Sequence, residues 1–266
     1  MKLKRIISLG MAAVLAISLA SCAKTPESLI EKADKKLERG KYTVEVDIDY
    51  TASDKAISGV LEQLEGSDTM LYFDGEDVLV EQRMTIDYGE GSTNFFGNHV
   101  IVDGTVYSDS GYTVSGVGNT VKQRASITDG QKKELIEKAG VVIGVGIENF
   151  SAATLDKIDG EQIITCTGAD EELSIRLENL LLSQLEGTAE SVGVSNVRML
   201  IEIDDGRYES VKVICDYSIV LSSKTYSVKA EFELEYDYDD YRRIVAPNDH
   251  YEYSEVGFDK ITDIFS

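Results

Sequence analysis

Apolar and polar residues alternate with a period of two through long stretches of the chain, and this alternation predicts β-strands with one dry and one wet face. Asp103-Gly104, between two apolar runs, predicts a tight hairpin turn. The last three alternating stretches predict consecutive long antiparallel strands. The stretches are 42–52, 78–88, 161–167, 197–203, 211–221 and 226–238.

The period changes to about 3.6 residues in four other segments, which predicts amphipathic helices. The first helix is expected near 26–39, after the capping residue Thr25 and before Gly40. Long one-sided strands together with several amphipathic helices predict an α+β fold. We expect a strongly curved antiparallel sheet, an unclosed half β-barrel, with amphipathic helices covering its concave face. The other three helical segments are 128–139, 170–186 and the tail at 258–265.

The N-terminal residues have the pattern of an export signal. Basic residues precede an apolar run over 6–19, which is shorter than the roughly 20 residues that a membrane span needs. The run ends in Leu19-Ala20-Ser21-Cys22. This string resembles the bacterial lipoprotein box, in which the cysteine is linked to diacylglycerol and becomes the new N-terminus.

The resemblance to a lipoprotein box implies that residues 1–21 are a signal peptide that is removed. Residues 22–266 then form the mature chain, which diacylglycerol and palmitate at Cys22 anchor in the cell membrane on its extracytoplasmic face. An ordinary secretory signal that happens to end near a cysteine is the alternative. Because no linker or internal repeat divides residues 22–266, a single domain is expected.

The chain has 26 basic and 48 acidic residues and a formal net charge of −22. Such a surface repels the phosphate backbone, which excludes nucleic acid as a partner. Many of the acids belong to the wet rows of predicted strands, as Glu231, Glu233 and Glu235 do. The negative charge therefore indicates which face of the sheet is exposed to water, and it gives little information about a ligand.

Residue types that carry catalysis are sparse. The chain has two histidines, His99 in a strand and His250 in a loop, and it has no GxSxG, HExxH, CxxC or P-loop motif. Neither an enzyme, a cofactor nor a metal centre is therefore expected. Cys166 and Cys215 fall in strand-like runs, where they are either buried thiols or a disulfide. The acidic turn at 237–240 is either solvated or a calcium site.

Aromatic and other large apolar side chains gather on the dry rows of the predicted strands. Such rows line a pocket for an apolar ligand, or they fill the core beneath a half-barrel. The candidates for a cavity lining are Tyr50, Met84, Met199, Tyr217, Tyr226, Val228, Phe232, Leu234 and Tyr236.

The layout of the chain carries a second resemblance. A lipoprotein box is followed by a short helix with Leu29 and Leu37, a strand ending at Tyr50, the hairpin at 102–107, and closing strands that lead to 244–247. This order resembles the exported lipoproteins of Gram-positive bacteria that are similar to the LolA/LolB/LppX superfamily. The resemblance implies an unclosed β-barrel with helices at its mouth and, in some members, a cavity that carries lipids. This sequence differs from the carriers in lacking Trp.

These features predict a monomeric, membrane-anchored and non-catalytic lipoprotein that binds a lipid-like or other amphipathic ligand in a half-barrel cavity. The alternative is a structural or interaction module of the cell envelope that has no small-molecule ligand. In that case the acidic strand face or a loop contacts another envelope protein.

Overall fold

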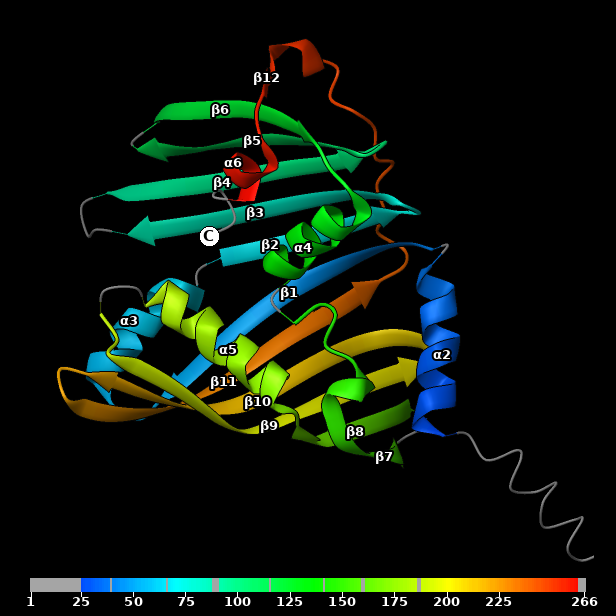
Figure 1. Cartoon of the computed structure of the whole chain (residues 1–266), viewed down its shortest axis with the longest axis vertical. Coiled ribbons are helices and arrows are strands. Elements are labelled where there is room, and N and C mark those ends of the chain that lie inside the picture. The colour runs from blue at the N-terminus through cyan, green and yellow to red at the C-terminus, as the bar shows by residue number, and fades with distance from the viewer. Residues whose placement is uncertain are drawn as a thin grey trace, which may run out of the picture.

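The computed structural model shows an α+β chain built on one large curved sheet that does not close on itself (Figure 1). The fold class and the curved, mostly antiparallel sheet expected from the sequence are therefore confirmed. The predicted signal peptide and Cys22 lie outside the described residues. The described ranges are 25–38, 40–65, 67–87, 91–114, 116–140, 142–158, 161–185 and 188–262.

Twelve strands form the sheet within these ranges: β1 (Lys41–Ala52), β2 (Ser67–Asp74), β3 (Asp77–Asp87), β4 (Ser92–Val102), β5 (Thr105–Val114), β6 (Val117–Ser126), β7 (Phe150–Ile158), β8 (Glu161–Ala169), β9 (Ser191–Asp204), β10 (Arg207–Leu221), β11 (Lys224–Asp237) and β12 (Ser254–Glu255). Strands β1–β6 form a first antiparallel meander, and β7–β11 form a second one. Pairing of β1 with β11 joins the two meanders, so β6 and β7 lie toward opposite edges of the sheet.

The helices among the described residues are α2 (Pro26–Leu37), α3 (Lys55–Glu65), α4 (Asp129–Ala139), α5 (Glu171–Gln184) and α6 (Phe258–Thr262), with two short 3-10 helices, η1 (Ile147–Asn149) and η2 (His250–Glu252). Helix α3 follows β1, α5 follows β8, and α4 lies in the link between the two meanders. Helix α2 lies across strand ends of the second meander (Figure 1). In this part of the chain, no helix has both the length and the apolar character needed to cross a membrane.

Side-chain caps explain where three helices begin. Thr25 and Ser28 form a capping box at α2, with Ser28 N donating to Thr25 Oγ1 at 3.3 Å. Thr128 caps α4 in the same way, and Asp170 Oδ1 accepts from Leu173 N at 2.8 Å at the start of α5. Each such cap satisfies a backbone N–H that has no partner inside the helix.

The sheet has one apolar face, which we define by Val46, Leu234, Val211 and Ile201. These four side chains stand opposite one another on β1, β11, β10 and β9. Helix α5 contacts β9 and contributes a leucine stripe to the same core cluster. The stripe has a spacing of four residues, and burial of each large apolar side chain contributes about 1.5–3 kcal/mol. Its members, Leu173, Leu177, Leu181 and Leu185, are at most 2% exposed.

Residues 238–262, which we call the C-terminal strap, run from the end of β11 back over the first meander. Thr43 Oγ1 donates to the carbonyl of Asp240, and the guanidinium of Arg242 lies 4.1 Å from the ring centroid of Tyr72. Both Thr43 and Tyr72 alternate with residues of the apolar face, so the first part of the strap lies on the opposite face of the sheet. Its last part, α6, returns to the apolar side, where Ile261 belongs to the core cluster.

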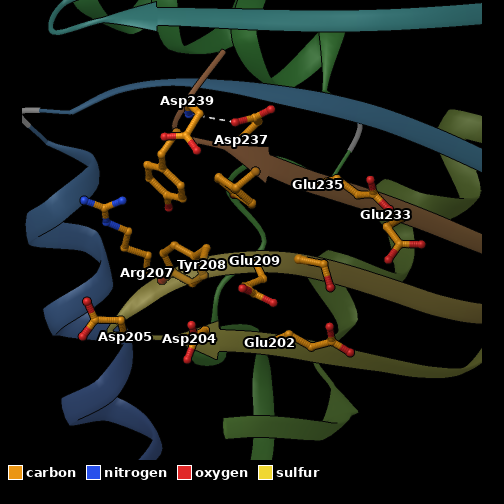
Figure 2. A pocket seen from close by; sticks show the side chains of 13 residues that line it. Glu202, Asp204, Asp205, Arg207, Tyr208, Glu209, Glu233, Glu235, Asp237 and Asp239 are labelled. Carbon is orange, nitrogen blue, oxygen red and sulfur yellow. Dashed lines mark hydrogen bonds between the residues drawn. The ribbon is translucent and has the colours of Figure 1, made fainter. Parts of the chain in front are cut away.

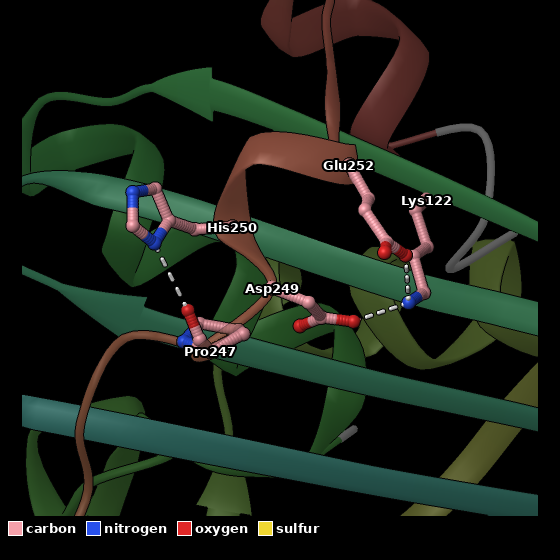
Figure 3. A network of polar contacts seen from close by, with 5 residues as sticks. All are labelled: Lys122, Pro247, Asp249, His250 and Glu252. Carbon is pink, nitrogen blue, oxygen red and sulfur yellow. Dashed lines mark hydrogen bonds and ion pairs between the residues drawn. The ribbon is translucent and has the colours of Figure 1, made fainter.

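The far end of the strap is fixed to β5 and β6. Lys122 forms ion pairs with Asp249 and with Glu252, the latter at 3.1 Å (Figure 3). The ring of Tyr253 packs edge-on against Tyr107 with centroids 5.6 Å apart. Strand β12 then pairs in parallel with β6, so the strap covers part of that edge of the sheet.

Candidate functional site

A cavity of about 320 Å³ lies between α2, the loop that follows α4 and the apolar face of the sheet. Its volume falls within the range of about 300–1,000 Å³ that is usual for small-molecule sites. The floor comes from β1, β9, β10 and β11, and the roof comes from α2 and the loop at 142–148. Segments far apart in the sequence therefore build one site.

Three side chains form the centre of the floor. Ile201 stands opposite Val211, and Val211 stands opposite Leu234 on the next strand. They are 3%, 7% and 2% exposed, so they belong to the packed core and to the cavity wall at once. Because their neighbours on both sides are β-strands, the floor is rigid.

The roof combines one helix face with a loop. Ile30, Asp34 and Leu37 line the cavity from α2, and their spacing of four and three residues places them on one face of the helix. The loop at 142–148 passes Gly144, whose φ of +84° favours glycine. Loops are generally more mobile than the elements they connect, so this loop is the part of the roof that can move most easily.

One wall of the cavity is polar. The Tyr208 hydroxyl donates a hydrogen bond of 2.6 Å to Asp34 Oδ1, which joins β10 to α2. Burial, and then the hydrogen bond to Asp34, raise the pKa of Tyr208 above its ordinary value, so the hydroxyl keeps its proton. Glu148, in η1, supplies a second carboxylate to the lining.

Four aromatic rings surround this polar wall. Tyr42 stacks on Phe73 with centroids 4.5 Å apart, and Tyr208 stacks on Tyr236 at 5.5 Å. The two pairs meet where Tyr42 and Tyr236 lie 6.2 Å apart. All four rings line the cavity, and burial raises the pKa of Tyr42 and of Tyr236 above the ordinary value.

An open acidic depression of about 550 Å³ lies at the ends of β9, β10 and β11 (Figure 2). Most of its acids, such as Glu202, Glu233 and Glu235, alternate with residues of the apolar face and therefore stand on the opposite face of the sheet from the cavity. Tyr208 and Tyr236 line both the depression and the cavity. Burial, and then the carboxylate of Asp204, raise the pKa of Glu209 within the depression. Arg207 is the one cation among the described lining residues. The acids are Glu202, Asp204, Asp205, Glu209, Glu233, Glu235, Asp237 and Asp239.

A groove of about 710 Å³ lies between α4 and α5. Its lining mixes both signs of charge, with Lys133 and Glu137 on α4 and with Glu172 and Arg176 on α5. The guanidinium of Arg176 donates to the carbonyl of Ile143 at 3.0 Å, which ties α5 to the cavity roof.

The residues predicted to line a cavity are dispersed along the sheet. Leu234 and Tyr236 line the cavity under α2. Met199, Tyr217, Val228 and Phe232 are at most 2% exposed and belong to the core cluster that includes the leucine stripe of α5.

The remaining predicted residues lie away from the cavity. The Tyr50 hydroxyl donates to Gln184 Oε1 at 3.1 Å, at the C-terminal end of α5. Tyr226 lies 4.5 Å below the amine of Lys224, and Met84 stands opposite Phe95 in the first meander.

Sequence reasoning missed most of the roof and the polar wall. The signal for Ile30, Asp34 and Leu37 was the helical spacing, which identifies a buried face but not what it faces. Tyr208 lies three positions before Val211, where the apolar row of β10 begins, so strict alternation would place its side chain on the opposite face of the strand. A register shift between Tyr208 and Ser210 returns its side chain to that row.

The other candidate groups are placed as follows. His99 is fully buried, and burial lowers its pKa to about 3. His250 is exposed, and its Nδ1 atom lies 3.2 Å from the carbonyl oxygen of Pro247 (Figure 3). Cys166 and Cys215 are free, buried thiols whose pKa burial raises to about 11 and 12. In the described ranges, which include the turn at 237–240, no three His, Cys, Asp or Glu side chains gather as metal ligands would.

No protein-family model matches the chain, and no curated protein matches it. A solved structure described as an N-terminal dehydratase from the difficidin assembly line aligns with 78% of this chain and 82% of its own, at 8% identity and a TM-score of 0.14. A likeness at this level supports no conclusion about fold or function. Any functional conclusion therefore rests on the site itself.

Proposed function

We propose that the protein is a non-catalytic, monomeric lipoprotein that binds a lipid-like or other amphipathic ligand in the cavity under α2. The observation that carries the proposal is the composition of that cavity. Its floor and most of its roof are apolar, while Asp34, Tyr208 and Glu148 supply a few polar groups. Small-molecule sites have this composition, in which apolar walls provide affinity and a few polar groups orient the ligand.

We also propose that the sheet is a half β-barrel similar to the LolA/LppX type, with α2, α4 and α5 covering its concave face. The buried leucine stripe of α5 and the cavity-lining residues Ile30 and Ile136 support this arrangement, because all of them pack against the core cluster of the sheet. In such a fold, a cavity remains where the helices leave the apolar face unfilled.

We propose an anchor at Cys22 on the extracytoplasmic face of the cell membrane. Cys22 precedes Pro26, the first residue of α2, by only four positions. An extended chain covers at most about 3.5 Å per residue, so such an anchor would hold the start of α2 within about 15 Å of the membrane surface. The ligand would then be exchanged close to the bilayer.

Fluorescence of N-phenyl-1-naphthylamine, a probe that brightens in apolar sites, tests the proposal on the purified full chain. We expect the probe to bind and to be displaced by single-chain amphiphiles. Ile30→Trp places an indole in the cavity and is expected to weaken probe binding by about tenfold, which corresponds to about 1.4 kcal/mol. Native mass spectrometry is expected to show a bound amphiphile in the same preparation.

Ile175→Trp is the matched control, because Ile175 lies on α5 with 47% of its surface exposed and does not line the cavity. This variant should bind the probe as the parent chain does. Equal binding by both variants, or no probe binding by the parent chain, would contradict the proposed function and favour an interaction module without a small-molecule ligand.

A further inference from the structure

We propose that the polar end of the ligand is a cation, so that the cavity takes an alkylammonium amphiphile: an apolar chain ending in a protonated or quaternary amine. The inference rests on the proposed function, because it concerns the same cavity. Three observations support it: the charges on the lining, the aromatic rings, and the acidic depression at the neighbouring strand ends.

The ionisable side chains on the lining are acids and phenols. Asp34 and Glu148 contribute carboxylates from α2 and η1, and both residues are exposed toward water. Within the described part of the chain, no Lys, Arg or His side chain lines the cavity. A ligand carboxylate or phosphate would meet like charges here, whereas an ammonium group would meet opposite ones.

Basic side chains also occur close to the site. Lys132 and Lys133 line a depression that shares Ile136, Ile143 and Gly144 with the cavity, and two further basic residues are engaged outside it. Lys36, on α2, donates to the carbonyl of Asp205 at 2.5 Å, in the turn before β10. Arg176 lines the groove between α4 and α5, from which it donates to the carbonyl of Ile143. Neither residue belongs to the cavity lining, so the net charge on the lining is negative.

The aromatic rings favour the same ligand class. Tyr42, Phe73, Tyr208 and Tyr236 line the cavity together. Aromatic rings attract a cation through the negative potential on their faces, and quaternary ammonium groups are recognised in this way. Aromatic rings offer an anion no comparable attraction, so they add to the preference that the carboxylates set.

The acidic depression extends the negative potential beyond the cavity. Eight carboxylates and one arginine line it, and it shares Tyr208 and Tyr236 with the cavity (Figure 2). A cleft lined by one sign of charge concentrates ions of the opposite sign and raises their rate of association. Amphiphilic cations would therefore be enriched at the strand ends where Tyr208 and Tyr236 line both the depression and the cavity, and anions would be depleted there.

Three ligands with the same decyl chain test the inference by displacement of N-phenyl-1-naphthylamine from the full chain near neutral pH and low salt. They are decyltrimethylammonium, decanol and decanoate, each used below its micelle concentration. We expect decyltrimethylammonium to bind at least about tenfold more tightly than decanoate, with decanol between them. Higher salt should narrow the difference, because the carboxylates at the rim are screened.

Asp34→Asn keeps a hydrogen-bond acceptor for the Tyr208 hydroxyl and removes one negative charge. It should reduce the preference for the cation over decanoate several-fold, and it should change the binding of uncharged decanol less than the binding of decyltrimethylammonium. Glu148→Gln, at an exposed position, is a second variant with the same expected direction. Asp156→Asn, on the exposed surface of β7 and outside the lining, is the control that should keep the parent preference.

The outcomes separate the two proposals. If all three ligands displace the probe but decanoate binds as tightly as decyltrimethylammonium, the proposed function stands and the cation preference is overturned. If the preference is present but neither Asp34→Asn nor Glu148→Gln changes it, the assignment to this cavity is overturned. If no ligand displaces the probe, the proposed function fails and the inference fails with it.

Discussion

The second meander carries the leucine stripe of α5 on its apolar face, whereas the outer strands of the first meander expose apolar side chains on that face. Tyr112 and Val121 are 44% exposed, and Val117 is 77% exposed. By contrast, Met199 and Phe232, on β9 and β11, are completely buried. The core of the sheet also includes Val80, Ile101 and Val106 of the first meander, which are at most 2% exposed. The two halves therefore differ at the outer ends of β5 and β6, where the packing of the first meander stops.

The two halves also differ in what they bury. In the first meander, Val80 stands opposite His99, and His99 stands opposite Ser108, so two polar side chains lie fully buried in this row. The corresponding row of the second meander, through Val213 and Met199, is apolar. Burial of polar groups costs free energy that apolar burial does not.

This difference indicates where each half obtains its stability. The second meander is stabilised by its own helix and core. The outer strands of the first meander depend more on the strap, which crosses the opposite face and fixes β5 and β6 through Lys122 and Tyr253. The halves should therefore respond differently to substitutions of similar size.

The largest effect is expected in the packed half. Phe232→Ala removes a fully buried ring from the core, and we expect the free energy of unfolding to fall by about 3–5 kcal/mol. Tyr112→Ala, at a residue that is 44% exposed, should cost less than about 1 kcal/mol. Urea unfolding followed by tyrosine fluorescence measures both. Equal losses would contradict the contrast between the halves.

A smaller, pH-dependent effect is expected in the first meander. Burial lowers the pKa of His99 to about 3, so on acidification the unfolded chain takes up a proton that the folded chain does not. Stability linked to His99 is therefore complete above the unfolded pKa, near 6.5, and is lost as the pH falls toward the folded value. At pH ~4.5 the loss should be about 2 kcal/mol relative to neutral pH.

His99→Gln isolates this contribution from that of the many carboxylates. Between about pH 6.5 and 4.5, the free energy of unfolding of His99→Gln should fall by about 2 kcal/mol less than that of the parent chain. His250→Gln, at the other and exposed histidine, should keep the parent slope. Parallel slopes in all three chains would show that His99 does not limit acid stability.

The strongest local patterns in the sequence predicted the fold correctly. Alternation identified β1, β3, β10 and β11, and Asp103-Gly104 forms the hairpin turn with φ values of 49° and 69°, as such a turn requires. Helix α3 and strands β2, β6, β7 and β12 were missed. Strand β6 has a largely polar and exposed sequence, so its neighbours and the strap hold it in the sheet rather than its own pattern.

The candidate site was harder to predict, because it depends on pairings that local patterns do not contain. Val44 and Tyr236 become neighbours only through the pairing of β1 with β11, almost the whole chain apart. The roof loop at 142–148 has no periodic pattern, and the register shift at Tyr208 reverses the side expected from alternation. Alternation placed Leu234 and Tyr236 on the dry row of β11, but it placed Val228 and Phe232 there as well, and these two lie in the core away from the cavity.

The smallest expected effect concerns the strap alone. Tyr253 is 7% exposed and packs against Tyr107, whereas Tyr251, two residues earlier, is 75% exposed. Tyr253→Ala should lower the free energy of opening the strap by about 1–2 kcal/mol, because it removes one buried ring and one aromatic pair. Amide hydrogen exchange should then become faster in β12 and the adjoining edge of β6, while exchange in β9 and β10 stays unchanged. Tyr251→Ala should exchange as the parent chain does. If Tyr253→Ala instead accelerates exchange throughout both meanders, the strap is part of the global folding unit and the two halves do not differ in the way argued above.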